Sequence, residues 1–281
     1  MSSQRRKTDP IGEVRKIKDP LSRAKVASRT ITESQQVEIE LARLRREAIE
    51  EAAEGGMSYT SIADEIGLSR GRVSQIRSDG PPLERVLFGV GPIDIGLPLR
   101  PVEGRDLPVV ASEDIRARDE LATMLDGLGF VIDQVDIDPR LPWQPQAPDL
   151  VAVCGPKSSP TIEEILENDP VLEFKPDDDG RWGITDRVTG QLFVSPMDES
   201  VPLNEDVAYV GRVRFDDRRS LFLVAGVHAI GSLGAVHYLS THLGTIYEQV
   251  GTKNFSMVIA SENNGQGEIK RSEAACLALP H

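Results

Sequence analysis

The stretch Ser58–Arg77 reads SYTSIADEIGLSRGRVSQIR and predicts two short helices joined by a tight turn. Gly67 is placed to end the first helix, since glycine adopts the left-handed turn conformation without steric cost. Ser69 follows as a cap for the second helix, because its hydroxyl oxygen can accept hydrogen bonds from free backbone amides. Apolar residues at helical spacing are expected to hold the two helices together: Ile62, Ala63, Ile66, Val73 and Ile76. This spacing favours a helix-turn-helix over an ordinary helical hairpin.

The outer face of the second helix is predicted to be polar and basic. Its expected DNA-binding residues are Ser69, Arg70, Arg72, Ser74, Gln75 and Arg77. Arg and Gln side chains are suited to hydrogen bonds with phosphates and with base edges in a major groove. The alternative interpretation is a solvated basic face with no DNA partner.

The same segment resembles region 4 of bacterial sigma factors and the related sigma-like helix-turn-helix regulators. The matching residues are Ser58-Tyr59, Ile62-Ala63, Ile66-Gly67-Leu68-Ser69 and Arg72-Val73-Ser74-Gln75-Ile76-Arg77. The resemblance covers residues 37–77 and implies promoter-type DNA binding. It does not imply a working sigma factor, because the chain has no region that would melt a promoter.

The size and composition of the chain are those of a two-domain globular protein. It has 281 residues, of which 39% are hydrophobic and 27% charged. No apolar run approaches the ~18–20 residues needed to span a bilayer, and the N-terminus lacks a secretory signal. The two cysteines, Cys154 and Cys276, are too few for a disulfide framework or a zinc site. We therefore expect a cytoplasmic, nucleoid-associated protein without a membrane partner.

The net charge of −13 is unevenly distributed along the chain. Residues 1–80 carry 15 Lys and Arg against 13 Asp and Glu, whereas residues 81–281 carry 17 against 32. The basic residues of the first part gather at Arg5–Lys7, Arg15–Lys18 and Arg70–Arg77. DNA binding depends on such a local positive face rather than on net charge.

Breaks in composition divide the chain into five predicted segments. Apolar residues at three- and four-residue steps predict a support helix over Val37–Gly55, and Ser78–Pro82 marks a linker because consecutive prolines cannot continue a helix. The segments are a basic, weakly helical arm at 1–36, a helix-turn-helix domain at 37–78, a linker at 79–85, an α/β domain at 86–262 and a flexible tail at 263–281.

The α/β domain is predicted from strands that alternate with helices, which favours a Rossmann-like, mostly parallel sheet. The expected helices are 112–128, 161–168 and 230–250. The expected strands and extended segments are 86–90, 93–99, 108–111, 130–137, 149–155, 171–174, 182–186, 191–195, 207–215, 221–226 and 255–261. The fold class is thus an N-terminal all-α domain followed by an α/β domain.

Two strand-to-helix turns are candidates for binding a small, anionic ligand, since ligands of open α/β sheets lie at the carboxyl ends of strands. Their candidate residues are Gly155, Lys157, Ser158, Ser159, Gly226, His228, Gly231 and Ser232. Lysine, hydroxyl groups and glycine-rich backbone suit an anion. Neither turn has the spacing of a Walker loop or a dinucleotide fingerprint. Tight packing is the alternative reason for the glycines.

No catalytic or metal-binding residue is assigned from the sequence, and no cofactor is specified. His228 lies at a strand end, where an imidazole can contact a ligand. The segment Ser195–Asp198 and the carboxylates Glu205 and Asp206 are expected to border the same cleft. Cys154 is interpreted as a small buried residue rather than a nucleophile.

The second domain is similar to uncharacterised α/β modules attached to helix-turn-helix segments in actinobacterial proteins, through DLVAVCGPKSSP and VAGVHAIGSLGAVHYL. We interpret the chain as a regulator that binds double-stranded DNA as a homodimer or higher oligomer and senses a ligand or assembles through its second domain. One alternative is an enzyme that processes a nucleotide or sugar phosphate and is targeted to DNA. The other is a sigma-like adaptor that contacts RNA polymerase.

Overall fold

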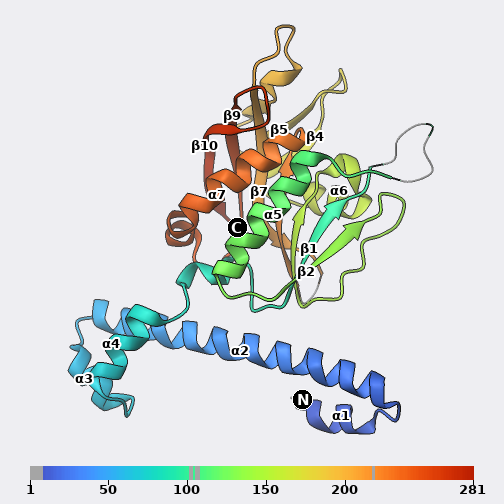
Figure 1. Cartoon of the computed structure of the whole chain (residues 1–281). Helices are drawn as coiled ribbons and strands as arrows, with labels where there is room; N and C mark the ends of the chain where they lie inside the picture. Colours follow the sequence, from blue (N-terminus) through green and yellow to red (C-terminus); the bar gives the residue numbers. More distant parts are fainter. Residues whose placement is uncertain (1–8, 101–103, 105–107, 217–218) are drawn as a thin grey trace, which may run out of the picture.

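A computed structural model describes residues 9–100, 104, 108–216 and 219–281. The chain forms an N-terminal helical region, α1–α4, and a C-terminal α/β region that begins at Leu83 (Figure 1). The basic cluster Arg5–Lys7 lies outside the described residues. No helix in the part of the chain that the structure describes is both long and apolar enough to cross a membrane.

The first two helices of the helical region have the same N-terminal sequence pattern. α1 (Pro10–Lys16) and α2 (Pro20–Glu54) each begin at a proline that follows a capping aspartate, Asp9 or Asp19. α2 is a single helix of 35 residues, so it extends far upstream of the predicted support helix. The predicted boundary between residues 36 and 37 therefore lies inside a continuous helix.

Two short helices fold against the C-terminal part of α2. α3 (Tyr59–Glu65) and α4 (Arg70–Asp79) begin at the caps Ser58 and Ser69, whose side chains accept hydrogen bonds from backbone amides. Gly67 has φ +69° in the turn between them, a conformation that favours glycine. A small core joins these helices to α2 through Ile49, Ile62, Ala63, Val73 and Ile76.

Polar contacts connect α2 to the α/β region. Gln36 donates a hydrogen bond to the Gly129 carbonyl oxygen, and Tyr247 donates one to Glu47. A 3-10 helix, η1 (Leu83–Leu87), stands where an extended segment over 86–90 was predicted. It buries Arg85, which donates a hydrogen bond to Gln36.

The main sheet has seven strands in the order β10-β9-β7-β8-β3-β1-β2. Their bounds are β1 (Ile93–Pro98), β2 (Ile132–Ile137), β3 (Asp149–Val153), β7 (Glu205–Arg214), β8 (Ser220–Gly226), β9 (Phe255–Asn263) and β10 (Ile269–Pro280). The pairs β2-β1, β1-β3 and β3-β8 are parallel, whereas β8-β7, β7-β9 and β9-β10 are antiparallel. The prediction of a mostly parallel sheet is therefore wrong, and the sheet is mixed.

Short connections explain the antiparallel half of the sheet. The link between Arg214 and Ser220, like that between Asn263 and Ile269, is too short for a crossover, so the joined strands must run in opposite directions. Most of the predicted flexible tail follows the second link and forms β10, which pairs along β9. This corrects the tail prediction: exposed and half-buried residues alternate from Arg271 to Leu277 on an edge strand, where one face is open to water.

Helices and a small second sheet cover the two faces of the main sheet (Figure 1). On one face, α5 (Ser112–Gly127) and α7 (Ala229–Val250) pack over the strands around Phe222 and Ile95. On the other, α6 (Pro160–Glu167) packs beside a three-stranded sheet of β4 (Leu172–Pro176), β5 (Trp182–Asp186) and β6 (Leu192–Val194). The segment 108–111, predicted as a strand, forms only an isolated bridge between Arg100 and Val109.

Candidate functional site

The outer face of α4 is exposed, as the sequence predicts. Arg70, Arg72, Ser74 and Gln75 are exposed, and Ser69 caps the helix beside them. Val73 and Ile76 lie on the opposite, buried side. Arg77 differs from the prediction, because its guanidinium lies 4.0 Å from the centre of the Tyr59 ring and is half-buried against α3. Stacking of this kind makes Arg77 a link between the two helices.

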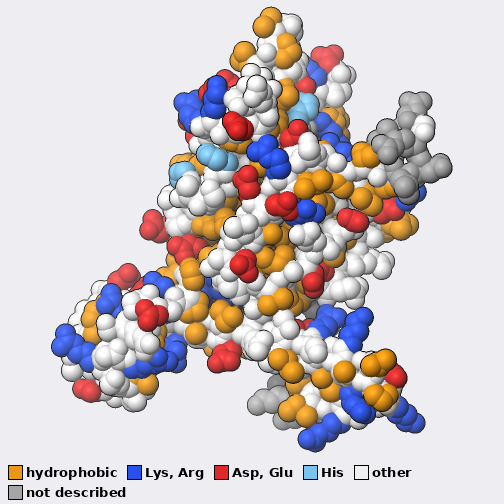
Figure 2. Space-filling view, in the orientation of Figure 1, with side chains coloured by type: hydrophobic (Ala, Val, Ile, Leu, Met, Phe, Trp, Pro, Cys, Tyr) orange, Lys and Arg blue, Asp and Glu red, His pale blue; other side chains and the backbone are white. Residues whose placement is uncertain are grey.

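The charged groups on this face make few contacts with the rest of the chain. Arg72 Nη1 donates a hydrogen bond to Gln75 Oε1 at 2.6 Å, so the two side chains form a polar pair on the helix surface. Arg70 has no hydrogen bond or ion pair with any described residue. Figure 2 shows basic side chains spread over the lobe formed by α3, α4 and the end of α2. These groups can approach an anionic surface without breaking an existing salt bridge.

A second candidate site is a cavity of about 380 Å³ at the carboxyl ends of β1, β3 and β8, which we call the strand-end cavity. It brings together the two turns that the sequence singles out, because β3 and β8 are neighbours in the sheet. Six of the eight predicted ligand residues line it: Gly155, Lys157, Ser158, Gly226, His228 and Ser232. Its size is within the range of small-molecule sites.

Lys157 supplies the most accessible positive charge in the strand-end cavity. Its Nζ donates a hydrogen bond to the Val227 carbonyl oxygen at 3.0 Å and lies 5.5 Å from the centre of the Trp182 ring. Partial burial lowers the pKa of Lys157, an effect that Asp198 and Asp206 oppose. The ammonium group makes no ion pair within the described residues, so it can serve as a point of attachment for an anion.

Side chains of the protein itself accept hydrogen bonds from backbone amides of the glycine-rich second turn. Asp206 Oδ2 accepts hydrogen bonds from the backbone amides of His228 and Gly231, at 3.0 and 2.9 Å, and so occupies the N-terminus of α7. Burial raises the pKa of Asp206, while Ser195 and His228 act in the opposite direction. Gly226 N donates to Ser232 Oγ. The amides of Gly226, His228 and Gly231 are therefore not available to a ligand, and Gly231 lies outside the cavity.

The glycines of α7 serve close packing instead. A Cβ at Gly231 would lie 2.8 Å from the Val207 carbonyl oxygen, and one at Gly234 would overlap Ser261. Only glycine lets α7 lie this close to β7 and β9. In the first turn, Ser159 is buried and caps α6, so it too is structural and does not line the cavity.

His228 lies at the edge of the cavity between two carboxylates. Its Nε2 is 3.0 Å from Asp198 Oδ1, and its backbone amide is held by Asp206. Neither aspartate itself lines the cavity, so the expectation that they border it is not met, and they reach it only through His228. Cys154 is buried, and burial raises the pKa of its thiol, so the thiolate needed for nucleophilic attack is disfavoured.

An ion pair that the sequence analysis missed completes the cavity wall. Arg100 Nη2 lies 2.5 Å from Asp114 Oδ2, joining the end of β1 to the first turn of α5. Burial raises the pKa of Asp114, and the Arg100 charge opposes this shift. Neither residue belongs to a recognisable motif. Only the expectation that β1 ends beside β3 could have suggested them.

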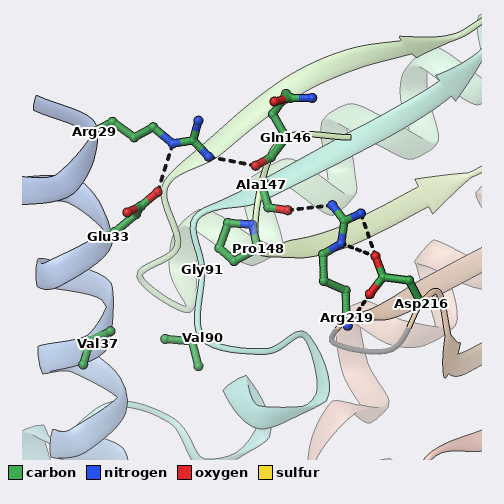
Figure 3. Close-up of a pocket in the computed structure, with 10 residues that line it drawn as sticks. All are labelled: Arg29, Glu33, Val37, Val90, Gly91, Gln146, Ala147, Pro148, Asp216 and Arg219. Atoms are coloured by element: carbon green, nitrogen blue, oxygen red, sulfur yellow. Dashed lines mark hydrogen bonds and ion pairs between the residues drawn. The ribbon is translucent and has the colours of Figure 1, made fainter. Parts of the chain in front are cut away.

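A larger hollow of about 870 Å³ separates α2 from the α/β region (Figure 3). Its two arginines are already bound: Arg29 contacts Glu33 and the Gln146 carbonyl oxygen, and Arg219 contacts Asp216. This hollow therefore offers little unsatisfied charge to a ligand. It leaves α2 attached by a few polar contacts rather than by a continuous apolar core.

Comparisons with protein-family models, with curated proteins and with solved structures find no match to this chain. The interpretation of the two sites therefore depends on their geometry. Within the described residues, no group of three or more His, Cys, Asp or Glu is arranged to hold a metal ion.

Proposed function

We propose that the chain is a DNA-binding transcriptional regulator whose α3–α4 unit is a helix-turn-helix. The observation that carries this proposal is the outer face of α4, where Arg70, Arg72 and Gln75 are exposed while Val73 and Ile76 anchor the opposite side. A recognition helix needs this division, because its apolar side fixes it to the protein while its polar side enters the major groove.

The side chains on α4 are expected to have different roles in DNA recognition. Arg72 and Gln75 form a hydrogen-bonded pair that can present polar groups to base edges, for which Arg prefers guanine and Gln adenine. Arg70, in the first turn, is suited to a phosphate or a base. Arg77 supports the helix through Tyr59 and is not part of the proposed reading face.

The test of this function is selection from a random pool of duplex DNA with the full chain. We expect retained DNA to share a sequence motif after a few rounds. We also expect the logarithm of the affinity to fall linearly with the logarithm of salt concentration, because bound phosphates release counterions. A pool with no common motif, or binding insensitive to salt, would contradict the proposal.

We further propose that the α/β region binds a small anion in the strand-end cavity, as in Rossmann-like folds. The support is topological: the chain leaves β1 toward β2 on one side, while β3 lies on the other. Ligands of open sheets bind at such a switch point. Lys157, with no ion pair to a described residue, supplies the charge.

Replacing Lys157 with alanine tests this ligand site, with inorganic phosphate as the probe. At tenfold its dissociation constant, phosphate should stabilise the wild-type chain by about 1.4 kcal/mol, seen as a higher unfolding temperature. Lys157→Ala should lose most of that increase. The control is Lys175→Ala on β4, an exposed lysine paired with Glu173, which should keep it. An equal phosphate effect in all three proteins would exclude Lys157 as the attachment point.

A further inference from the structure

One side of α2 exposes a regular series of apolar side chains, which we call the α2 stripe: Val37, Leu41, Leu44 and Ala48. The exposed fractions are 49% for Val37, 61% for Leu41 and 43% for Leu44. Their steps of four, three and four residues are those of the a and d positions of a coiled coil. Gln36 and Arg43, by contrast, are buried against the α/β region. The stripe thus lies beside the docked face of the helix, and its first residue, Val37, also lines the hollow between α2 and the α/β region (Figure 3).

Two opposite charges flank the α2 stripe on its outer side. Glu38 and Arg45 both follow a d position and therefore occupy equivalent e positions, one heptad apart. Neither forms a hydrogen bond or ion pair with any residue that the structure describes. On the inner side, Glu40 and Glu47 are already paired with Arg43. Glu38 and Arg45, which flank the stripe without a partner among the described residues, therefore have opposite signs.

We propose that the α2 stripe is the interface for a second copy of this chain, with the two α2 helices antiparallel. In this register Leu41 of each copy packs on Leu44 of the other, and Val37 packs on Ala48. The dyad then falls between residues 42 and 43. Equivalent e positions meet across such a pair, so Glu38 of each copy faces Arg45 of the other. The surface is self-complementary in shape and in charge, as a twofold interface requires.

The apolar surface continues beyond the stripe toward α3. A hollow of about 350 Å³ is lined by Ala48, Ala52, Met57, Ile66 and five other residues. Met57 and Ile66 are 44% and 45% exposed. Because this hollow adjoins the stripe at Ala48, the partner helix can cover both, which enlarges the area available to a dimer.

The proposed register also sets the separation of the two α3–α4 units. At 1.5 Å per residue, Glu54 lies about 17 Å from the dyad, so the C-terminal ends of the two α2 helices are about 35 Å apart. This matches the ~34 Å between half-sites one turn of DNA apart. The dimer itself does not rest on DNA binding, since the stripe and its charges are independent of α4.

The test is the mass of the full chain in solution, measured by sedimentation without DNA. The wild type should be a dimer, and Leu41→Glu/Leu44→Glu should be a monomer with an unchanged circular dichroism spectrum. Leu21→Glu is the matched control, because Leu21 is an 81% exposed leucine on the same helix but outside the stripe. It should remain dimeric. A monomeric wild type, or a dimeric double variant, would overturn the proposal.

Charge reversal tests the antiparallel register and does not disturb the apolar residues. Arg45→Glu should weaken the dimer about tenfold, because it replaces two attractive pairs with two repulsive ones. Glu38→Arg/Arg45→Glu should restore affinity to within about threefold of the wild type, since each reversed charge again meets its opposite. Failure of the second change to restore the dimer would overturn the antiparallel pairing. A dimer without DNA binding would contradict only the proposed function.

Discussion

Replacing Arg85 with alanine is expected to lower the free energy of unfolding by about 3–5 kcal/mol, the largest stability change that we predict for a single substitution. Arg85 is fully buried and donates hydrogen bonds to Gln36 and to the carbonyl oxygens of Leu128 and Val90. Its guanidinium lies 3.5 Å from the centre of the Phe130 ring. Alanine would leave three buried acceptors without a donor and a cavity over the ring.

The charge of Arg85 is retained at neutral pH. Burial lowers the pKa of Arg85 to about 10, with Glu40 and Asp149 acting in the opposite direction. The folded protein therefore keeps a buried cation whose two terminal nitrogens are bound by neutral oxygens and whose Nε has no hydrogen-bond partner among the described residues. Its removal affects both α2, through Gln36, and the end of α5.

Urea denaturation would measure this loss, with Arg271→Ala as the control. Arg271 is an exposed arginine on β10, 3.8 Å from Glu273. Its removal should change stability by less than about 0.5 kcal/mol. A loss below about 1 kcal/mol for Arg85→Ala would show that the three acceptors find other donors, and would contradict its role as the connection between the two regions.

The second large effect concerns DNA: Arg70→Ala/Arg72→Ala should weaken binding about 100-fold. Each lost arginine contact to a base or phosphate costs roughly 1–3 kcal/mol of binding free energy. Two such losses exceed the change in the free energy of unfolding that replacing these two exposed side chains should cause. The magnitude of the salt slope of the affinity should fall by up to about 2 if both side chains neutralise phosphates. Both residues are exposed, so the fold should be unchanged.

A matched variant separates a local effect from one of net charge. Lys270→Ala/Arg271→Ala also removes two positive charges, but from exposed positions on the edge strand β10. Fluorescence anisotropy with the selected DNA should give wild-type affinity for this variant. Equal weakening by both double variants would mean that overall charge, and not the face of α4, controls binding.

Local sequence patterns predicted the elements of the fold well, because each pattern acts over a few residues. The turn at Gly67, the cap at Ser69 and the strand-to-helix alternation from Ile93 to Val250 are signals of this kind. The direction of strand pairing was harder to predict. β7 follows the same apolar pattern as the parallel strands, and only its short link to β8 identifies it as antiparallel.

Residues of the strand-end cavity could be predicted from the sequence where they follow strands whose carboxyl ends lie side by side. Lys157 and His228 line one cavity because β3 and β8 are adjacent. The role of Asp206 could not be predicted, since its contact with the amides of α7 joins residues more than 20 positions apart without any motif. The same applies to Arg100 and Asp114, which meet across the end of β1.

The length of α2 gives the molecule a mechanical property. Contacts with the α/β region hold α2 at Gln36 and again at Glu47, so only its last seven residues, about 10 Å at 1.5 Å per residue, extend beyond them. A tilt of about 10° at Glu47 displaces the end of the helix by only about 2 Å. Thus α2 is a rigid strut: it transmits the position of the α/β region to the α3–α4 unit with little freedom of its own.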